Sequence, residues 1–96
     1  MKHVVVRYRL KPECIEEHET LVRGVFAELA EVRPAGLDDR VFKLGDGVSF
    51  LHVATMTTAD NPLPGLAAFQ AFTADLKRRC EEPPVSAEGT RVGAYP

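Results

Sequence analysis

Two strand-like runs on either side of the tripeptide Gly45-Asp46-Gly47 constrain the fold of this chain more than any other feature. Residues 40–44 and 48–57 are rich in β-branched and aromatic residues, which favour strands. The glycines between them can take the positive φ angles that a tight turn requires. The pattern therefore predicts a β-hairpin near the middle of the chain, and the elements before and after it decide the fold class.

A strand and a helix are predicted before this hairpin. Residues 3–10 alternate with a period of two and are followed by Pro12, which ends the strand. From Cys14 to Arg33 apolar side chains recur at helical spacing, and glutamates gather near the start, where the helix dipole favours negative charge. The segment "RPAG" ends this helix.

A second amphipathic helix and a last strand are predicted after the hairpin. The segment "ADNPLPG" breaks the chain, and apolar residues then lie along one side of a helix over residues 66–80. The run "KRR", residues 77–79, lies in its last turn, where cations suit the helix dipole. Pro83 and Pro84 stop the helix, and "EGTRVGAYP", residues 88–96, is predicted to form a short terminal strand.

The order strand, helix, strand, strand, helix, strand predicts an α+β, ferredoxin-like βαββαβ fold with a four-stranded antiparallel sheet. Both helices then cover one sheet face, and we expect them to run parallel to each other. A chain of 96 residues suits one domain, residues 1–96, with a thin core. Parallel helices would hold Cys14 and Cys80 ~24 Å apart, too far for a disulfide, so we expect free thiols.

The sheet face opposite the helices needs a cover. On the first strand Val4, Val6, Tyr8 and Leu10 are expected to face the helices, while His3, Val5, Arg7 and Arg9 point away. The third strand has apolar residues on both sides, so its pattern does not decide which side faces the helices. A second copy packed sheet to sheet would cover the remaining face, which predicts a homodimer in the form of a dimeric α/β barrel. Arg7 and Arg9 would then pair with acids or a ligand, or lie in water at the end of the strand.

Charge and hydropathy exclude several classes of protein. The formal net charge is −2, and the Lys and Arg residues are mostly scattered, so we expect no nucleic-acid partner. No segment approaches the ~18 consecutive apolar residues of a membrane span, and the N-terminus lacks the features of a signal peptide. We therefore expect a soluble, cytoplasmic protein with no membrane partner. Acylphosphatases and RNA-recognition domains share this strand order. The phosphate-binding loop of the acylphosphatases is missing from this sequence, and so are the exposed aromatic residues on a basic sheet face that RNA-recognition domains need.

The opening "MKHVVVRYRLKPE", with the acidic helix after it, resembles the start of the stress-responsive A/B-barrel proteins. The rhythm of helix, "GDG" hairpin and helix over nearly the whole chain is similar to that of the antibiotic-biosynthesis monooxygenase-like domains. Both groups belong to the dimeric α/β-barrel superfamily. The resemblance implies the fold and a homodimer. It also implies a range of activities, namely cofactor-independent oxygenation, haem degradation and polyketide cyclisation, besides members with no assigned reaction.

Residues associated with some of these activities are missing from this sequence. In the haem-degrading and oxygenase members, an Asn and a Trp are associated with the pocket. Members that bind haem also have a His on a helix. This chain has no Trp, its only Asn is Asn61 in a predicted loop, and its second helix has no His. Cyclase members use a first-strand His, but alignment on "LKP" places Val4 rather than His3 there, and their "HPxH"-like segment is absent. We therefore expect no haem degradation, no cyclisation and no cofactor.

His52 and Tyr8 are the candidate catalytic pair. An imidazole with a pKa near neutrality can act as a general base, and the Tyr8 hydroxyl can donate to a substrate oxygen. Arg7 is the candidate for holding an anionic group. A histidine in an apolar strand is also an ordinary hydrogen-bonded core or interface residue, so both interpretations of His52 stay open. His18, on the acidic first helix, is expected to be solvated, and the dispersed histidines predict no metal site.

Aromatic side chains offer a candidate pocket between the sheet and the second helix: Phe42, Phe50, Phe69 and Phe72. The same spacing also suits an ordinary core. We therefore expect a homodimer that binds a small apolar or aromatic molecule, and the resemblance implies cofactor-independent monooxygenase-like activity. The alternative is a catalytically inert structural or regulatory dimer whose pocket is filled by its own aromatic side chains.

Overall fold

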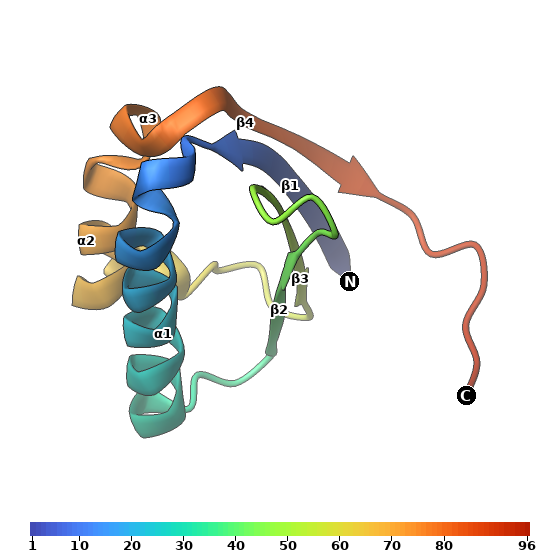
Figure 1. Cartoon of the computed structure of the whole chain (residues 1–96). Helices are drawn as coiled ribbons and strands as arrows, with labels where there is room; N and C mark the ends of the chain where they lie inside the picture. The colour runs from blue at the N-terminus through green and yellow to red at the C-terminus, as the bar shows by residue number, and fades with distance from the viewer.

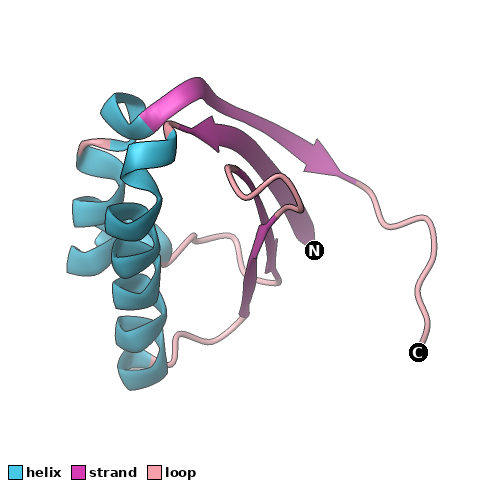
Figure 2. Ribbon diagram, in the orientation of Figure 1, coloured by secondary structure: helices cyan, strands magenta, loops and turns pink.

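One four-stranded antiparallel sheet, with helices packed on one face, makes up the computed structural model, which describes all 96 residues (Figures 1 and 2). The strands are β1 (Lys2–Leu10), β2 (Leu37–Lys43), β3 (Ser49–Met56) and β4 (Cys80–Gly89), in the sheet order β2-β3-β1-β4. The helices are α1 (Ile15–Val32), α2 (Ala67–Ala74) and α3 (Leu76–Arg79), with short 3-10 turns η1 (Pro12–Cys14) and η2 (Leu63–Gly65). None of these helices combines the length and the apolar character that a bilayer span needs. The predicted α+β, ferredoxin-like fold is confirmed.

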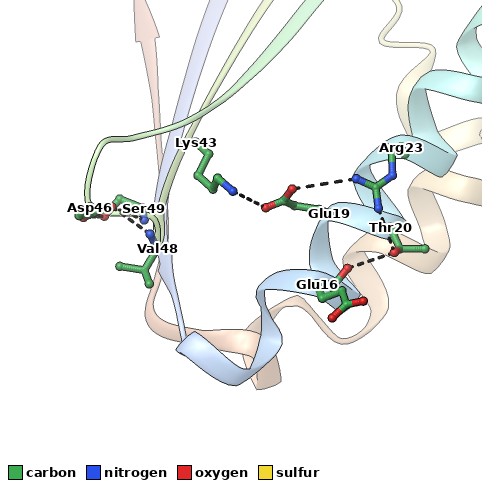
Figure 3. Close-up of polar contacts among 8 residues, drawn as sticks. All are labelled: Glu16, Glu19, Thr20, Arg23, Lys43, Asp46, Val48 and Ser49. Atoms are coloured by element: carbon green, nitrogen blue, oxygen red, sulfur yellow. Dashed lines mark hydrogen bonds and ion pairs between the residues drawn. The ribbon is translucent and has the colours of Figure 1, made fainter.

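The predicted hairpin consists of β2 and β3, and its turn includes Gly47 with a φ angle of 78°. Asp46 holds this turn. Its carboxylate accepts hydrogen bonds from the backbone N–H groups of Val48 (3.0 Å) and Ser49 (2.8 Å) and from Ser49 Oγ (2.6 Å) (Figure 3). These hydrogen bonds hold the pKa of Asp46 at about 2. The turn is therefore fixed by a charged side chain as well as by Gly47.

The last strand lies earlier in the chain than the sequence predicts. β4 starts directly after α3 and ends at Gly89, so that residues 90–96 form no strand. Pro83 and Pro84, which were expected to separate the helix from the strand, lie inside β4. The strand tolerates them because it is at the edge of the sheet and because they fall at a shift of its register against β1.

α1 and α2 run antiparallel, so the expectation of parallel helices is wrong (Figure 1). Each helix returns the chain along the strand that precedes it, and β1 and β3 are antiparallel neighbours, so the helices must also oppose each other. The start of α1 therefore lies at the end of α3, where the N–H of Lys11 donates to the carbonyl of Arg79 (2.8 Å). Cys14 and Cys80 are buried free thiols at this same end, and the expected separation of ~24 Å is wrong.

The helix-facing side of the sheet carries the core. Tyr8 and Leu10 of β1 are buried, as the alternation of that strand predicts. Tyr8 lies opposite Phe50 of β3, and Val6 lies opposite His52. Phe50 and His52 therefore face the helices. The apolar pattern of β3 alone did not decide which side of the strand faces them.

The opposite face of the sheet is not covered by any helix in the single chain (Figure 2), and it carries both apolar and charged side chains. One row across this face contains Phe42, Leu51, Arg7 and Val85, and the next row contains Arg40, Val53, Val5 and Ala87. Phe42 and Val85 leave 49% and 69% of their surface exposed. Farther along β1, Arg9 pairs with Glu82 at 3.3 Å. We call this surface the open sheet face.

Candidate functional site

Tyr8, His18, His52 and Arg79 form a hydrogen-bonded network between the sheet and the helices. Tyr8 Oη lies 2.5 Å from His18 Nε2 and 2.7 Å from His52 Nε2. On the other side of His18, Arg79 Nε donates to Nδ1 (3.2 Å), and Arg79 Nη2 donates to the carbonyl of Phe72 (2.5 Å). Tyr8, His18 and Arg79 are each at most 2% exposed, so these three members are screened from solvent.

His18 is fully buried, so the expectation that it is solvated is wrong. It lies four residues before Val22 and seven before Val25, on the side of α1 that packs against the sheet. Glu17 and Glu19, which made this segment look solvent-facing, turn instead to Arg78 and Lys43. The helical spacing was the signal that could have identified His18 as a core residue.

Arg79 is buried as well, which its place among the cations of residues 77–79 does not indicate. Its neighbours Lys77 and Arg78 are exposed. A buried guanidinium needs partners for its donors, and Arg79 has both His18 and the carbonyl of Phe72. Its guanidinium carbon also lies 5.7 Å from the centre of the Phe72 ring. Nothing in the run of residues 77–79 distinguishes Arg79 until α3 is placed against α1.

The partners decide which ring nitrogens carry hydrogen. A guanidinium has only N–H donors, so His18 Nδ1 is an acceptor, and neutral His18 carries its hydrogen on Nε2. That N–H donates to Tyr8 Oη, whose own hydrogen is then directed to Nε2 of His52. We therefore assign to His52 the tautomer with its hydrogen on Nδ1. Arg79 thus orients the whole series of hydrogen bonds.

Burial keeps both imidazoles and the phenol neutral. Desolvation, followed by the positive charge of Arg79, lowers the pKa of His18 to about 4. Desolvation also lowers the pKa of His52 to about 4, and it raises the pKa of Tyr8 above its ordinary value. At neutral pH the network therefore carries one charge, that of Arg79.

Aromatic rings surround the network. The Tyr8 ring stacks on Phe50, with centroids 5.6 Å apart and an interplanar angle of 7°. The Phe72 centroid lies 5.2 Å from that of His18 and 5.7 Å from that of His52. Phe69 follows at 6.0 Å from Phe72. The structure thus gathers Phe50, Phe69 and Phe72 around the pair Tyr8 and His52.

His52 also lines a narrow cleft between the sheet and the helices. Asp39 of β2 stands on its wall, together with apolar side chains that include Val22, Val41 and Phe69. The volume of this inner cleft is about 10 Å³, which is room for about one water molecule. Asp39 is the only carboxyl group that lines it, and the sequence did not single this residue out.

A wider groove of about 490 Å³ adjoins the inner cleft along α1 and β2. The groove and the cleft share Val22, Phe26 and Val41, so the groove leads towards His52. Charged side chains stand along this outer groove: Glu19, Arg23, Arg40 and Lys43. Figure 3 shows Glu19 between two of these cations, with Lys43 Nζ at 2.8 Å and Arg23 Nη1 at 4.0 Å from its carboxylate oxygens.

Two of the residues expected at the site lie apart from the rest. Phe42 lines the outer groove but not the inner cleft, and about half of it is exposed. Arg7 is exposed on the open sheet face, so within one chain it does not meet Tyr8 or His52. No group of three or more His, Cys, Asp or Glu side chains is gathered in a way that could hold a metal ion.

The fold is similar to those of several solved structures at low sequence identity. A chain from Nitrosomonas europaea, provisionally named an antibiotic biosynthesis monooxygenase, has a TM-score of 0.78 at 13% identity, over 95% of this chain and 89% of that chain. Another antibiotic biosynthesis monooxygenase has a TM-score of 0.73 at 16% identity, over 97% of this chain and 100% of that chain. A mutant of SnoaB, a cofactor-independent oxygenase from Streptomyces nogalater, has a TM-score of 0.74 at 17% identity, over 99% of this chain and 96% of that chain. No protein-family model matches the sequence, and no curated protein matches it. The fold is therefore that of the antibiotic biosynthesis monooxygenases.

Proposed function

We propose that this protein binds a small apolar or aromatic molecule in the outer groove and acts on it at His52. The observation that carries the proposal is the hydrogen bonding of His52. A buried histidine usually has partners for its ring nitrogens, whereas His52 is half-buried: Tyr8 holds its Nε2, and no group of the chain bonds its Nδ1. The free nitrogen belongs to a residue that lines the inner cleft, which shares Val22, Phe26 and Val41 with the outer groove.

The reaction that we propose is monooxygenase-like and independent of a cofactor, by analogy with the activity named for SnoaB. Without a cofactor, the substrate itself must supply electrons to dioxygen, and loss of a proton makes an aromatic molecule a better electron donor. The walls of the inner cleft are mostly apolar, so a hydrogen bond to the developing negative charge is stronger there than in water. His52 is the catalytic residue of this proposal because it is the network member that lines the cleft.

Tyr8 acts through His52 in this proposal. Its hydroxyl is buried and engaged with two imidazoles, so it does not reach a ligand directly. Tyr8 is therefore a positioning residue, and His18 and Arg79 orient it in turn.

Cations of the outer groove are better placed than Arg7 to hold an anionic substituent of the ligand. Arg23 and Lys43 share the single carboxylate of Glu19, which leaves an excess of positive charge at this position. Exposed ion pairs of this kind are weak, so an anionic group can displace Glu19. We therefore assign the anion-binding role within one subunit to Arg23 and Lys43.

We also propose a homodimer that buries the open sheet face of each subunit. Val5, Leu51 and Val53 form an apolar centre on this face, and Phe42 and Val85 are largely exposed beside it. Covering such side chains with a second copy stabilises the assembly by about 25 cal/mol for each Å² of apolar surface. Arg7 would then lie in the interface between the subunits, where a carboxylate or a ligand could pair with it.

Native mass spectrometry of the purified protein tests ligand binding. The expected result is a co-purified compound with an aromatic mass and fragmentation pattern. Consumption of dioxygen with that compound then compares the wild type with His52→Ala, which should lose turnover while the outer groove still binds the compound. His3→Ala is the matched control, since His3 bonds Thr55 on the open sheet face (3.0 Å) and should leave turnover unchanged. Unchanged turnover in His52→Ala would remove His52 from the reaction and leave the binding proposal standing.

The size of the inner cleft favours the second candidate, a catalytically inert dimer. At about 10 Å³, the cleft is nearly filled by side chains such as Phe69 and Phe72. If the protein is inert, the wild type should carry no ligand, and Phe69→Ala should create binding of naphthalene that the wild type lacks, because the deletion opens a cavity. Naphthalene binding by the wild type would contradict this candidate.

A further inference from the structure

A carboxyl group faces the inner cleft beside His52. Asp39 of β2 lies opposite Ala54, and Val41, two residues later, lies opposite His52. Asp39 and His52 are therefore diagonal neighbours on the helix-facing side of the sheet, a relationship that places side chains about 7–8 Å apart. Both line the inner cleft.

Both groups have hydrogen-bonding capacity to spare. The Asp39 carboxyl interacts with the backbone N–H of Arg40 and with no other side chain, and Nδ1 of His52 has no partner. No fully buried side-chain nitrogen or oxygen in the protein lacks a hydrogen bond, so the free nitrogen of His52 cannot be in the packed interior. Because His52 lines the inner cleft, we infer that this nitrogen meets a molecule that enters the cleft.

We propose that Asp39 and His52 clamp a hydroxyl group of the bound aromatic molecule, with the Asp39 carboxylate taking the hydroxyl proton and Nδ1–H of His52 donating to the hydroxyl oxygen. This inference rests on the proposed function, because it requires an aromatic molecule in the outer groove. The inner cleft has the volume of about one water molecule and so fits one oxygen atom. The ring would lie against Val22, Phe26 and Val41, where cleft and groove meet.

One proton moves in this step. The O–H bond of the ligand breaks, the proton forms an O–H bond with Asp39, and the electron pair stays on the ligand oxygen. The step needs no oxidant. His52 stabilises the oxyanion because the series of hydrogen bonds from Arg79 through His18 and Tyr8 already directs the His52 hydrogen to Nδ1. The general base is therefore Asp39, and His52 is the donor, which reverses the role that the sequence suggested for His52.

The surroundings of Asp39 suit a proton acceptor near neutral pH. Burial raises the pKa of Asp39 to about 6, while the N–H of Arg40 lowers it and the charge of Asp38 raises it. The other ionisable groups near it are His52 on β3 and Arg33 after α1, which shares a surface pocket with Asp39. α1 and α2 otherwise contribute only apolar side chains to the inner cleft. A base with a pKa near the working pH is an effective proton acceptor.

Binding of para-nitrophenol tests the clamp, because its phenol and phenolate forms differ in their visible spectra. The matched ligand is para-nitroanisole, which keeps the ring and the nitro group but has no hydroxyl proton. Both are titrated against the wild type, Asp39→Asn and Asp38→Asn. Asp38 is the matched control because it is the adjacent carboxylate, is exposed, points to the open sheet face and pairs with Arg40 at 3.2 Å.

The wild type is expected to bind para-nitrophenol about tenfold more tightly than para-nitroanisole near pH 6. It should release para-nitrophenol as the pH rises, because the Asp39 carboxylate and the phenolate are then both negatively charged in the same cleft. Asp39→Asn removes one of these charges, so its affinity for the phenolate should exceed that of the wild type by about tenfold near pH 8. Asp38→Asn should follow the wild type at both pH values apart from a small shift, because the charge of Asp38 contributes to the raised pKa of Asp39.

Three results would overturn the clamp. Equal pH profiles of para-nitrophenol binding for the wild type and Asp39→Asn would overturn the clamp. The proposed function would survive, since the aromatic molecule still binds. Equal affinity of the wild type for the two ligands would have the same meaning and needs no variant to fold. Failure of the wild type to bind either ligand would remove the clamp and the proposed function together.

Discussion

Arg79 Nε donates to His18 Nδ1 at 3.2 Å and thereby joins the end of α3 to the start of α1 across 61 residues of sequence. The donor is a guanidinium, which cannot accept, so this contact sets the tautomer of His18 and, through Tyr8, that of His52. The contact exists because the two helices are antiparallel. Through Arg79, the packing of the helices therefore determines the tautomer of His52 in the inner cleft.

Replacement of Arg79 by Met should destabilise the protein strongly. The change leaves His18 Nδ1 and the carbonyl of Phe72 without donors in a buried site, which costs roughly 2–4 kcal/mol of unfolding free energy. Urea unfolding measures the difference. Arg78→Met is the control, since Arg78 pairs with Glu17 on the surface and should change stability by less than about 1 kcal/mol. Equal effects of the two substitutions would contradict the assigned role of Arg79.

Stability should fall as the pH is lowered from about 6.5 to about 4. The pKa of His18 is lowered to about 4 in the folded protein from an ordinary 6.5, so in this window the unfolded chain binds a proton that the folded chain does not. The loss attributable to His18 is about 3 kcal/mol. His18→Gln keeps an acceptor for Arg79 and a donor for Tyr8 but does not titrate, so its stability should depend less on pH. Parallel profiles for the wild type and His18→Gln, measured by urea unfolding, would exclude this linkage.

Removal of the Tyr8 hydroxyl should release the tautomer of His52. In the wild type Nε2 of His52 accepts from Tyr8, so nitrogen NMR shifts are expected to show hydrogen on Nδ1. Tyr8→Phe removes the donor, and the shifts should move towards a mixture of the two tautomers. The lost hydroxyl also leaves His18 Nε2 without an acceptor, at a cost of about 1–3 kcal/mol. A wild type with hydrogen on Nε2 of His52 would show that the series of hydrogen bonds runs in the other direction.

Asp39→Asn should stabilise the protein at neutral pH. The folded-state pKa of Asp39 is raised to about 6 from 3.8, so stability is lost as the pH rises between these values and the carboxylate ionises in a partly buried place. A neutral amide avoids this loss, and after allowance for partial exposure the gain is about 1 kcal/mol at pH 7. Near pH 4 the gain should vanish. Asp38→Asn should stay within about 0.5 kcal/mol of the wild type.

Val53→Asp should break the proposed homodimer. Val53 stands in the middle of the open sheet face, where a carboxylate from each subunit would be desolvated and only Arg40, opposite it on β2, could pair with it. Light scattering is expected to report twice the chain mass of 10.6 kDa for the wild type and the single mass for Val53→Asp. Val32→Asp is the control, since Val32 is an exposed apolar residue at the end of α1. A wild type that scatters as a single chain at working concentrations would refute the dimer.

Local patterns were sufficient for the elements but not for all of their limits. The alternation of residues 3–10 and the helical spacing of residues 14–33 each report which side of one element is buried, and both elements form as expected. The start of β4 could not be predicted in this way. Pro83 and Pro84 normally end a strand, and they are tolerated here only because β4 is an edge strand with a register shift, which depends on the order of the whole sheet.

The sequence by itself determined the order of the elements, the hairpin, and the placement of Tyr8 and Leu10 towards the helices, because each follows from spacing within a short segment. Only the tertiary structure decided that His18 and Arg79 join Tyr8, and that Asp39 stands beside His52. These contacts depend on the direction of the helices and on the register of β2 against β3. A buried polar side chain is stabilised by partners from elsewhere in the chain, and no local pattern of apolar residues records which partners those are.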